Sequence, residues 1–97
     1  MEPQEILAQI TAALQTIIKE RNLHPMRFEV EPSLYGDLEI YITAPEFSGK
    51  TITERNMMIW PALEKRYKRE FLNKISFCLL LAPEEDPELE NCKRLEH

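Results

Sequence analysis

The sequence lacks the features that mark membrane, secreted or disulfide-stabilised proteins. No apolar run approaches the roughly 20 residues that a membrane-spanning helix needs. The only two cysteines, Cys78 and Cys92, lie far apart and make neither a disulfide framework nor a paired metal motif. The N-terminal stretch contains Glu2 and Glu5, lacks a basic start and so does not resemble a signal peptide. We therefore expect a protein of the reducing cytoplasm.

Catalytic and phosphate-binding patterns are missing as well. The sequence shows no Ser/His/Asp set, no paired carboxylates in a plausible cleft and no phosphate-binding loop. Gly36 and Gly49 are the only glycines, so no Gly-x-x-Gly loop is present through which backbone approaches a nucleic-acid phosphate. The formal net charge of −5 also gives no overall attraction to such a backbone. The sequence predicts a protein that is not an enzyme and holds no cofactor.

A chain of 97 residues makes one small domain. At this size only about 60–65% of the unfolded chain's surface becomes buried, which allows a single core layer. We assign this domain to residues 2–82. Residues 83–94 are acidic and interrupted by proline, which predicts a flexible tail. Residues 95–97, Leu-Glu-His, resemble the junction of an affinity tag and are left out of the fold.

The first half of the domain shows one helical pattern followed by two alternating ones. Apolar residues at spacings of three and four predict a helix over 3–21. Asn22 can take the left-handed conformation that closes such a helix. Alternation over 26–31 and 38–44 predicts two antiparallel strands, with Met26, Phe28 and Val30 facing the core.

The second half begins with a tight turn and a capped helix. Thr51 and Glu54 have capping-box spacing, and Pro61 interrupts the helical pattern that follows. We therefore expect one helix over 51–59 and another over 61–72, kinked or separated at Pro61. The run 75–82 is almost wholly apolar, which is typical of a strand buried on both faces.

The element order is helix, strand, strand, helix, helix, strand. A strand–helix–strand crossover favours parallel pairing of the second and third strands. The expected fold is therefore α/β (α+β), a three-stranded mixed sheet with its second strand central and its helices on one face.

The segment between the second and third strands resembles the signature segment of the BolA-like family. The matching residues are Phe47, Gly49, Arg55, Met58, Ile59 and Leu63, with Trp60 where the family often has an aromatic residue. The resemblance covers most of residues 2–82 and implies the layout shared by BolA-like proteins and type II KH domains. It also implies a protein partner, a monothiol glutaredoxin.

One property of the family is not expected here. BolA-like proteins help to hold an iron–sulfur cluster shared with the glutaredoxin, through a histidine near the last strand and a polar ligand after the signature arginine. This chain has Ser76 and Asn56 at those positions, and a hydroxyl and a neutral amide are poor ligands for iron. We therefore expect no bound metal.

Several residues remain as candidate contacts. Partner binding is assigned to Lys50, Arg55, Asn56 and Met57, beside the start of the capped helix. A basic cluster comprises Lys65, Arg66, Lys68, Arg69 and Lys74. The cluster is either a solvated helix face or a patch for an acidic protein or nucleic acid. His24 is expected at the surface, Cys78 as a small core residue and Cys92 as an exposed thiol.

Two hypotheses follow. The first is a BolA-like interaction or regulatory module that works by protein contact. The second is a nucleic-acid-binding regulator that uses the type II KH-like layout and the basic cluster.

Overall fold

The computed structural model describes residues 3–34 and 36–88. Its elements are α1 (Pro3–Glu20), β1 (Arg27–Pro32), β2 (Leu38–Thr43), η1 (Pro45–Phe47), α2 (Ile52–Arg66), α3 (Arg69–Leu72), β3 (Ile75–Leu81) and η2 (Pro83–Glu85), where η denotes a 3-10 helix. The predicted order of helices and strands is confirmed. Among the described residues, no helix is long and apolar enough to cross a membrane.

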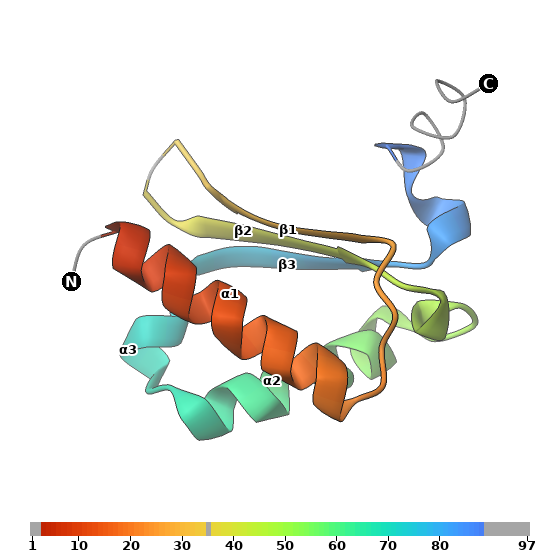
Figure 1. The fold of residues 1–97 in the computed structure, drawn as a ribbon, viewed down its shortest axis with the longest axis horizontal. Coiled ribbons are helices and arrows are strands. Elements are labelled where there is room, and N and C mark those ends of the chain that lie inside the picture. The colour runs from red at the N-terminus through yellow and green to blue at the C-terminus, as the bar shows by residue number, and fades with distance from the viewer. Residues whose placement is uncertain (1–2, 35, 89–97) are drawn as a thin grey trace.

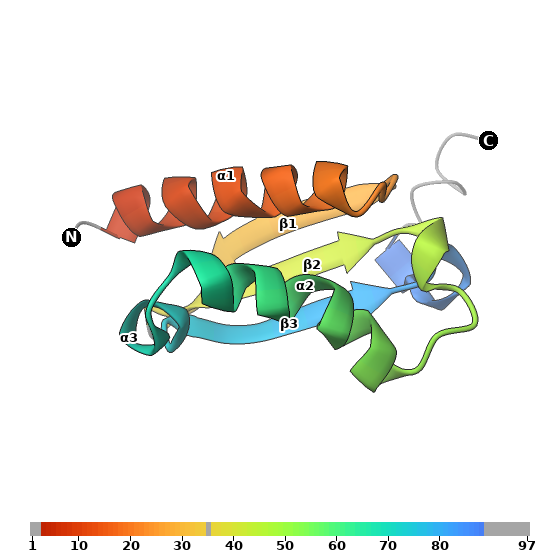
Figure 2. The same cartoon turned by 90° about the horizontal axis from the view of Figure 1, so that it is seen from below.

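The three strands form one mixed sheet in the order β1-β2-β3. β1 and β2 pair antiparallel, and β2 and β3 pair parallel, as predicted. Figures 1 and 2 show α1, α2 and α3 on the same side of this sheet. We call the side that faces the helices the inner face and the opposite side the outer face.

The core lies between α1, α2 and the inner face. The helical stripe of α1 is buried, with Ile10, Leu14 and Ile17 fully enclosed. Ile40 and Ile42 of the central strand meet it, because alternation places both on the same face. The edge strand β1 contributes less: Phe28 and Val30 are half-buried, and Met26 is 46% exposed although it was expected to face the core.

The end of α1 is closed by Asn22 in the left-handed region, with a φ of 56°. The Asn22 N–H donates to the carbonyl of Lys19, and the Leu23 N–H donates to that of Ile18. These two bonds define a Schellman motif, whose usual hydrophobic contact is supplied by buried Leu23. The predicted closing role of Asn22 is confirmed.

The expected helix break at Pro61 is wrong. α2 runs without interruption from Ile52 to Arg66, and the break falls at Tyr67 and Lys68, whose backbones are extended. Pro61 removes one donor, to the carbonyl of Met57. Met57 lies on the exposed side of α2, where water can replace that donor, so the helix continues.

Candidate interaction surface

The start of α2 is fixed by local hydrogen bonds. Gly49 has a φ of 78°, which lets the chain turn tightly into the helix. The Glu54 N–H donates to Thr51 Oγ1 at 3.1 Å, and the Thr51 N–H donates to Glu54 Oε1 at 2.9 Å. The predicted capping box is therefore present, and the bond from the Thr51 N–H lowers the pKa of the Glu54 carboxyl. This cap leaves Ile52, the first helical residue, 76% exposed.

Arg55, which was assigned to partner binding beside the start of the capped helix, is not exposed. Its side chain is buried, and Nη1 donates to the carbonyl of Leu80 at 2.9 Å and to Glu85 Oε1 at 2.7 Å. The Ala82 N–H also donates to Glu85 Oε1, at 2.8 Å. The guanidinium and this N–H together lower the pKa of Glu85. Arg55 therefore joins α2 to the end of β3.

Asn56 is also occupied within the protein. Its Nδ2 donates to the carbonyl of Ile52 at 2.9 Å, and its Oδ1 accepts a hydrogen bond from Trp60 Nε1 at 3.1 Å. These bonds orient the half-buried indole against the core. Of the four residues assigned to partner binding, Lys50 and Met57 have exposed side chains, and Met57 is 63% exposed.

β3 is buried on its inner face only, which corrects the expectation of a strand buried on both faces. A bulge at Ser76 shifts the register, so that Leu38 pairs with Ile75 and Glu39 pairs with Phe77. Beyond the bulge, Leu80 points inward and is buried, whereas Phe77 and Leu79 point outward and are 40% and 41% exposed. Alternation alone would have placed Phe77 and Leu79 on the same face as buried Ile75, so their outward direction depends on the bulge.

Two elements carry most of the exposed apolar side chains: α2, on the helical side of the sheet, and β3, whose exposed side chains point to the outer face. Six large apolar residues are exposed among the described ones, and four of them lie in these two elements. Ile52 and Leu79 line one small pocket of about 170 Å³ between α2 and β3. We call the set Ile52, Met57, Phe77 and Leu79 the α2–β3 apolar patch.

The segment after β3 packs onto the sheet as far as it is described, although residues from 83 onward were expected to be loose. Asp86 is buried, accepts a hydrogen bond from Thr43 Oγ1 and accepts two from Arg27 Nη1 at 3.2 Å each. The Glu88 N–H donates to Asp86 Oδ1 at 3.0 Å. Residues 89–94 of the predicted tail and the tag junction 95–97 lie outside the described residues.

The basic cluster is exposed at every position, and it spreads over two sides of α3. Arg66 pairs with Glu20 of α1 at 2.9 Å. Arg66, Lys68 and Lys74 line an open pocket of about 460 Å³, where the rings of Tyr67 and Phe71 stack at 4.4 Å. Two aromatic residues that the sequence analysis did not include therefore accompany three of the cations.

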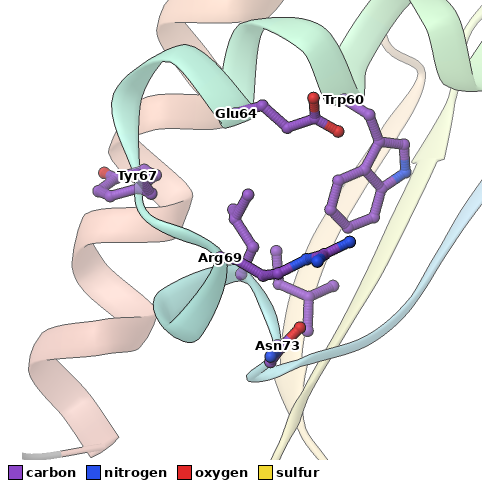
Figure 3. Close-up of a pocket in the computed structure, with 7 residues that line it drawn as sticks. Trp60, Glu64, Tyr67, Arg69 and Asn73 are labelled. Atoms are coloured by element: carbon purple, nitrogen blue, oxygen red, sulfur yellow. The ribbon is translucent and has the colours of Figure 1, made fainter.

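Arg69 lines a different pocket, of about 570 Å³, between the end of α2 and the start of β3. Figure 3 shows the Arg69 guanidinium extending toward Trp60. The Glu64 carboxylate also points toward Trp60, and Asn73 lies across the pocket from Glu64. The other lining residues are Tyr67, Leu72 and Ile75. The lining offers polar groups for binding, but it contains no cysteine, histidine or serine that would serve as a nucleophile.

The remaining candidate residues do not form a reactive site. His24 is exposed, and its Nδ1 lies 2.8 Å from Glu46 Oε2. The His24 N–H and imidazole lower the pKa of Glu46. Burial raises the pKa of the Cys78 thiol to about 12, which keeps it protonated at neutral pH. Among the described residues no three His, Cys, Asp or Glu side chains are placed to hold a metal ion, and Cys92 lies outside them.

Comparison with known protein families, curated proteins and solved structures finds no match to this chain. Its function therefore has to be inferred from the surfaces described above.

Proposed function

We propose that this protein is a non-catalytic, BolA-like module that works by contact with another protein. The observation that carries the proposal is the α2–β3 apolar patch, which contains four of the six large exposed apolar residues. Single exposed apolar side chains are common, but grouped ones mark interaction sites. Met and aromatic residues, represented here by Met57 and Phe77, are also enriched in protein interfaces.

The layout of the patch suits a docking surface. The capping box and the Arg55 contacts hold α2 and β3 in fixed positions, so little order has to be gained on binding. Lys50 lies exposed near the start of α2 and supplies a polar rim. Within this proposal Arg55 and Asn56 support the surface, and Lys50 and Met57 keep the contact role first assigned to them.

Resemblance to the BolA-like family makes a monothiol glutaredoxin the partner to test. We expect binding without a shared cluster, because both polar ends of the Asn56 side chain already bond to Ile52 and Trp60. Mixing the protein with a cluster-loaded monothiol glutaredoxin should therefore leave the visible absorption spectrum unchanged. Binding would then be measured by isothermal titration calorimetry.

A pair of matched variants tests the patch itself. Leu79→Ser removes a central apolar contact, and truncation of a central interface residue commonly weakens binding by tenfold or more. Leu34→Ser is the control, because Leu34 is 101% exposed and lies in the β1–β2 turn, outside the patch. Equal affinities for wild type and Leu79→Ser, or no binding at all, would count against the proposal.

The second candidate function is nucleic-acid binding. The specific observation in its favour is the stacked Tyr67 and Phe71 pair between exposed Arg66, Lys68 and Lys74. Single-stranded nucleic acids bind to such combinations of cations and aromatic rings.

Fluorescence anisotropy with a labelled single-stranded RNA tests this alternative. Phosphate contacts would make the logarithm of the binding constant fall by about 0.7 per logarithm of salt for each phosphate neutralised. Lys68→Glu should abolish such binding, whereas Lys50→Glu, a charge reversal outside the cluster, should not. Binding that is independent of salt would exclude this function.

A further inference from the structure

None of α1, α2 and α3 lies on the outer face of the sheet. Figure 1 shows α1, α2 and α3 below the sheet, and only the segment that follows β3 reaches the other side, at one end. The pairing register places nine side chains on this face. They are Arg27, Glu29, Glu31, Glu39, Tyr41, Thr43, Phe77, Leu79 and Leu81.

One side of the outer face is apolar. Phe77 and Leu79 project from β3, and the Phe77 ring meets the Tyr41 ring edge to face, with centroids 5.5 Å apart. This contact extends the apolar surface from the edge strand to the central strand. The apolar surface of the outer face therefore follows β3 through Phe77 and Leu79 and reaches the edge of the Tyr41 ring on β2, whose face is covered by the Arg27 guanidinium at 5.1 Å.

The other side of the outer face is acidic. Glu29, Glu31 and Glu39 point out of β1 and β2, next to this apolar surface. Arg27 is the face's cation, and it is paired with Glu29 at 2.9 Å, with buried Asp86 at 3.2 Å and with Glu88 at 3.1 Å. The acidic side therefore keeps an excess of negative charge.

This combination defines the chemistry of a matching surface. A ligand needs an apolar stripe against Tyr41, Phe77 and Leu79, and cations against Glu31 and Glu39. An α-helix is about 10 Å wide, which spans two to three strands at about 4.8 Å spacing. Phosphate-bearing nucleic acids and anionic lipids are repelled by the acidic side. A second copy of this chain would present the same carboxylates, and its outer-face cation, Arg27, is already ion-paired.

We propose that the outer face of the sheet binds a basic amphipathic helix of a partner protein. The inference rests on the proposed function, a module that works by protein contact, and it deepens that function by naming the docking face and the partner's chemistry. The helix lies along β2 and β3, with its apolar side on the apolar surface and its Lys and Arg residues toward β1.

Two model peptides of about 18 residues provide the probe. Both have the same amphipathic pattern of leucines, and one carries lysines where the other carries glutamates. The ¹⁵N-labelled full-length protein is titrated with each and followed by amide chemical shifts. The lysine peptide should bind and shift the amides of β2 and β3, and the glutamate peptide should bind at least tenfold more weakly.

Charge reversal then tests the acidic side. Glu31→Lys should weaken binding of the lysine peptide about threefold to tenfold at low salt, since exposed ion pairs are individually modest. The difference should shrink at about 1 M salt, where the Debye length is about 3 Å. Glu64→Lys is the control. It makes the same charge change at an exposed residue of α2, which lies on the opposite side of the sheet from the outer face.

Several outcomes would overturn the proposal. The first two are equal affinities for the two peptides and no binding of the lysine peptide. The others are amide shift changes confined to α2 and equal losses of affinity for the lysine peptide in Glu31→Lys and Glu64→Lys. Sedimentation equilibrium showing a dimer that Leu79→Ser dissociates would assign the face to a second copy instead. None of these results decides the glutaredoxin titration, so failure of the helix-docking inference is distinguishable from failure of the proposed function.

Discussion

Arg55 is the residue whose replacement tests the structure most directly. It was first assigned to partner binding, and the structure buries it between α2 and β3. We predict that Arg55→Met destabilises the protein, since the methionine fills a similar volume but cannot donate to the carbonyl of Leu80. The same substitution at an exposed contact residue would change affinity and leave stability almost unaltered.

The expected loss is about 2 kcal/mol. A buried carbonyl that loses a charged donor costs about 1–3 kcal/mol, and the bond from Arg55 Nη1 to the Leu80 carbonyl is buried. One term acts in the opposite direction: Arg55 Nε is buried without a hydrogen-bond partner, and methionine removes that penalty. Glu85 is 44% exposed and becomes solvated when Arg55 is lost, so its ion pair adds little to the total.

Urea denaturation followed by circular dichroism measures this loss. For a chain of this length, about 2 kcal/mol corresponds to a fall in Tm of roughly 8 °C or more. Lys50→Met is the matched control, because Lys50 is an exposed cation near the same end of α2 and its loss should stay within about 0.5 kcal/mol. Equal midpoints for Arg55→Met and wild type would refute the buried role of Arg55.

Four further outcomes are expected. Gly49→Ala should lower the free energy of unfolding by about 1 kcal/mol in urea, through φ strain alone, because an added Cβ meets no atom within 4 Å; an unchanged midpoint contradicts the turn. Asp86→Ala should cost about 2 kcal/mol, because the buried Thr43 hydroxyl loses its acceptor and Arg27 keeps only the partly exposed Glu29 and Glu88 as partners. Hydrogen exchange over 83–88 should also become faster, and unchanged exchange would contradict the role of Asp86. The lowered pKa of Glu46 stabilises the fold above the unfolded-state pKa of about 4.3, and this contribution disappears as pH falls through the lower folded-state pKa. On acidification, the free energy of unfolding should therefore fall less in Glu46→Gln than in wild type. Native Cys78 should resist iodoacetamide at pH 8 and react after unfolding, as peptide mass mapping will show; rapid native alkylation contradicts its burial.

Much of the fold was predictable, because it depends on local patterns. Three local patterns predicted elements that the structure contains. They are the spacing of apolar residues in α1, the alternation in β1 and β2, and the capping box at Thr51. Pro61 was misinterpreted, since its effect depends on which side of the helix loses a donor. That side is decided by tertiary packing.

The contacts around the candidate surface were less predictable, because they join residues far apart in the sequence. Arg55 meets Leu80 and Glu85, 25 and 30 positions away, and no periodic pattern indicates such a pair. The burial of Asp86 depends on Thr43, which is 43 positions earlier. The outward direction of Phe77 and Leu79, by contrast, follows from alternation once the bulge at Ser76 is known.

The contacts of Arg55 and Glu85 also bear on resistance to aggregation. The run from Ile75 to Ala82 has no charged residue, and β3 is an edge strand, a combination that favours addition of strands from other molecules. The Leu81 carbonyl accepts a hydrogen bond from Ala44, beyond the end of β2, so the carbonyl of Leu80 points to the open edge. Arg55 already donates to that carbonyl, and Glu85 already accepts from the N–H of Ala82. An incoming strand therefore finds neither group available for a backbone hydrogen bond at this end of β3. The Arg55–Glu85 ion pair thus protects one end of this apolar edge strand against strand addition.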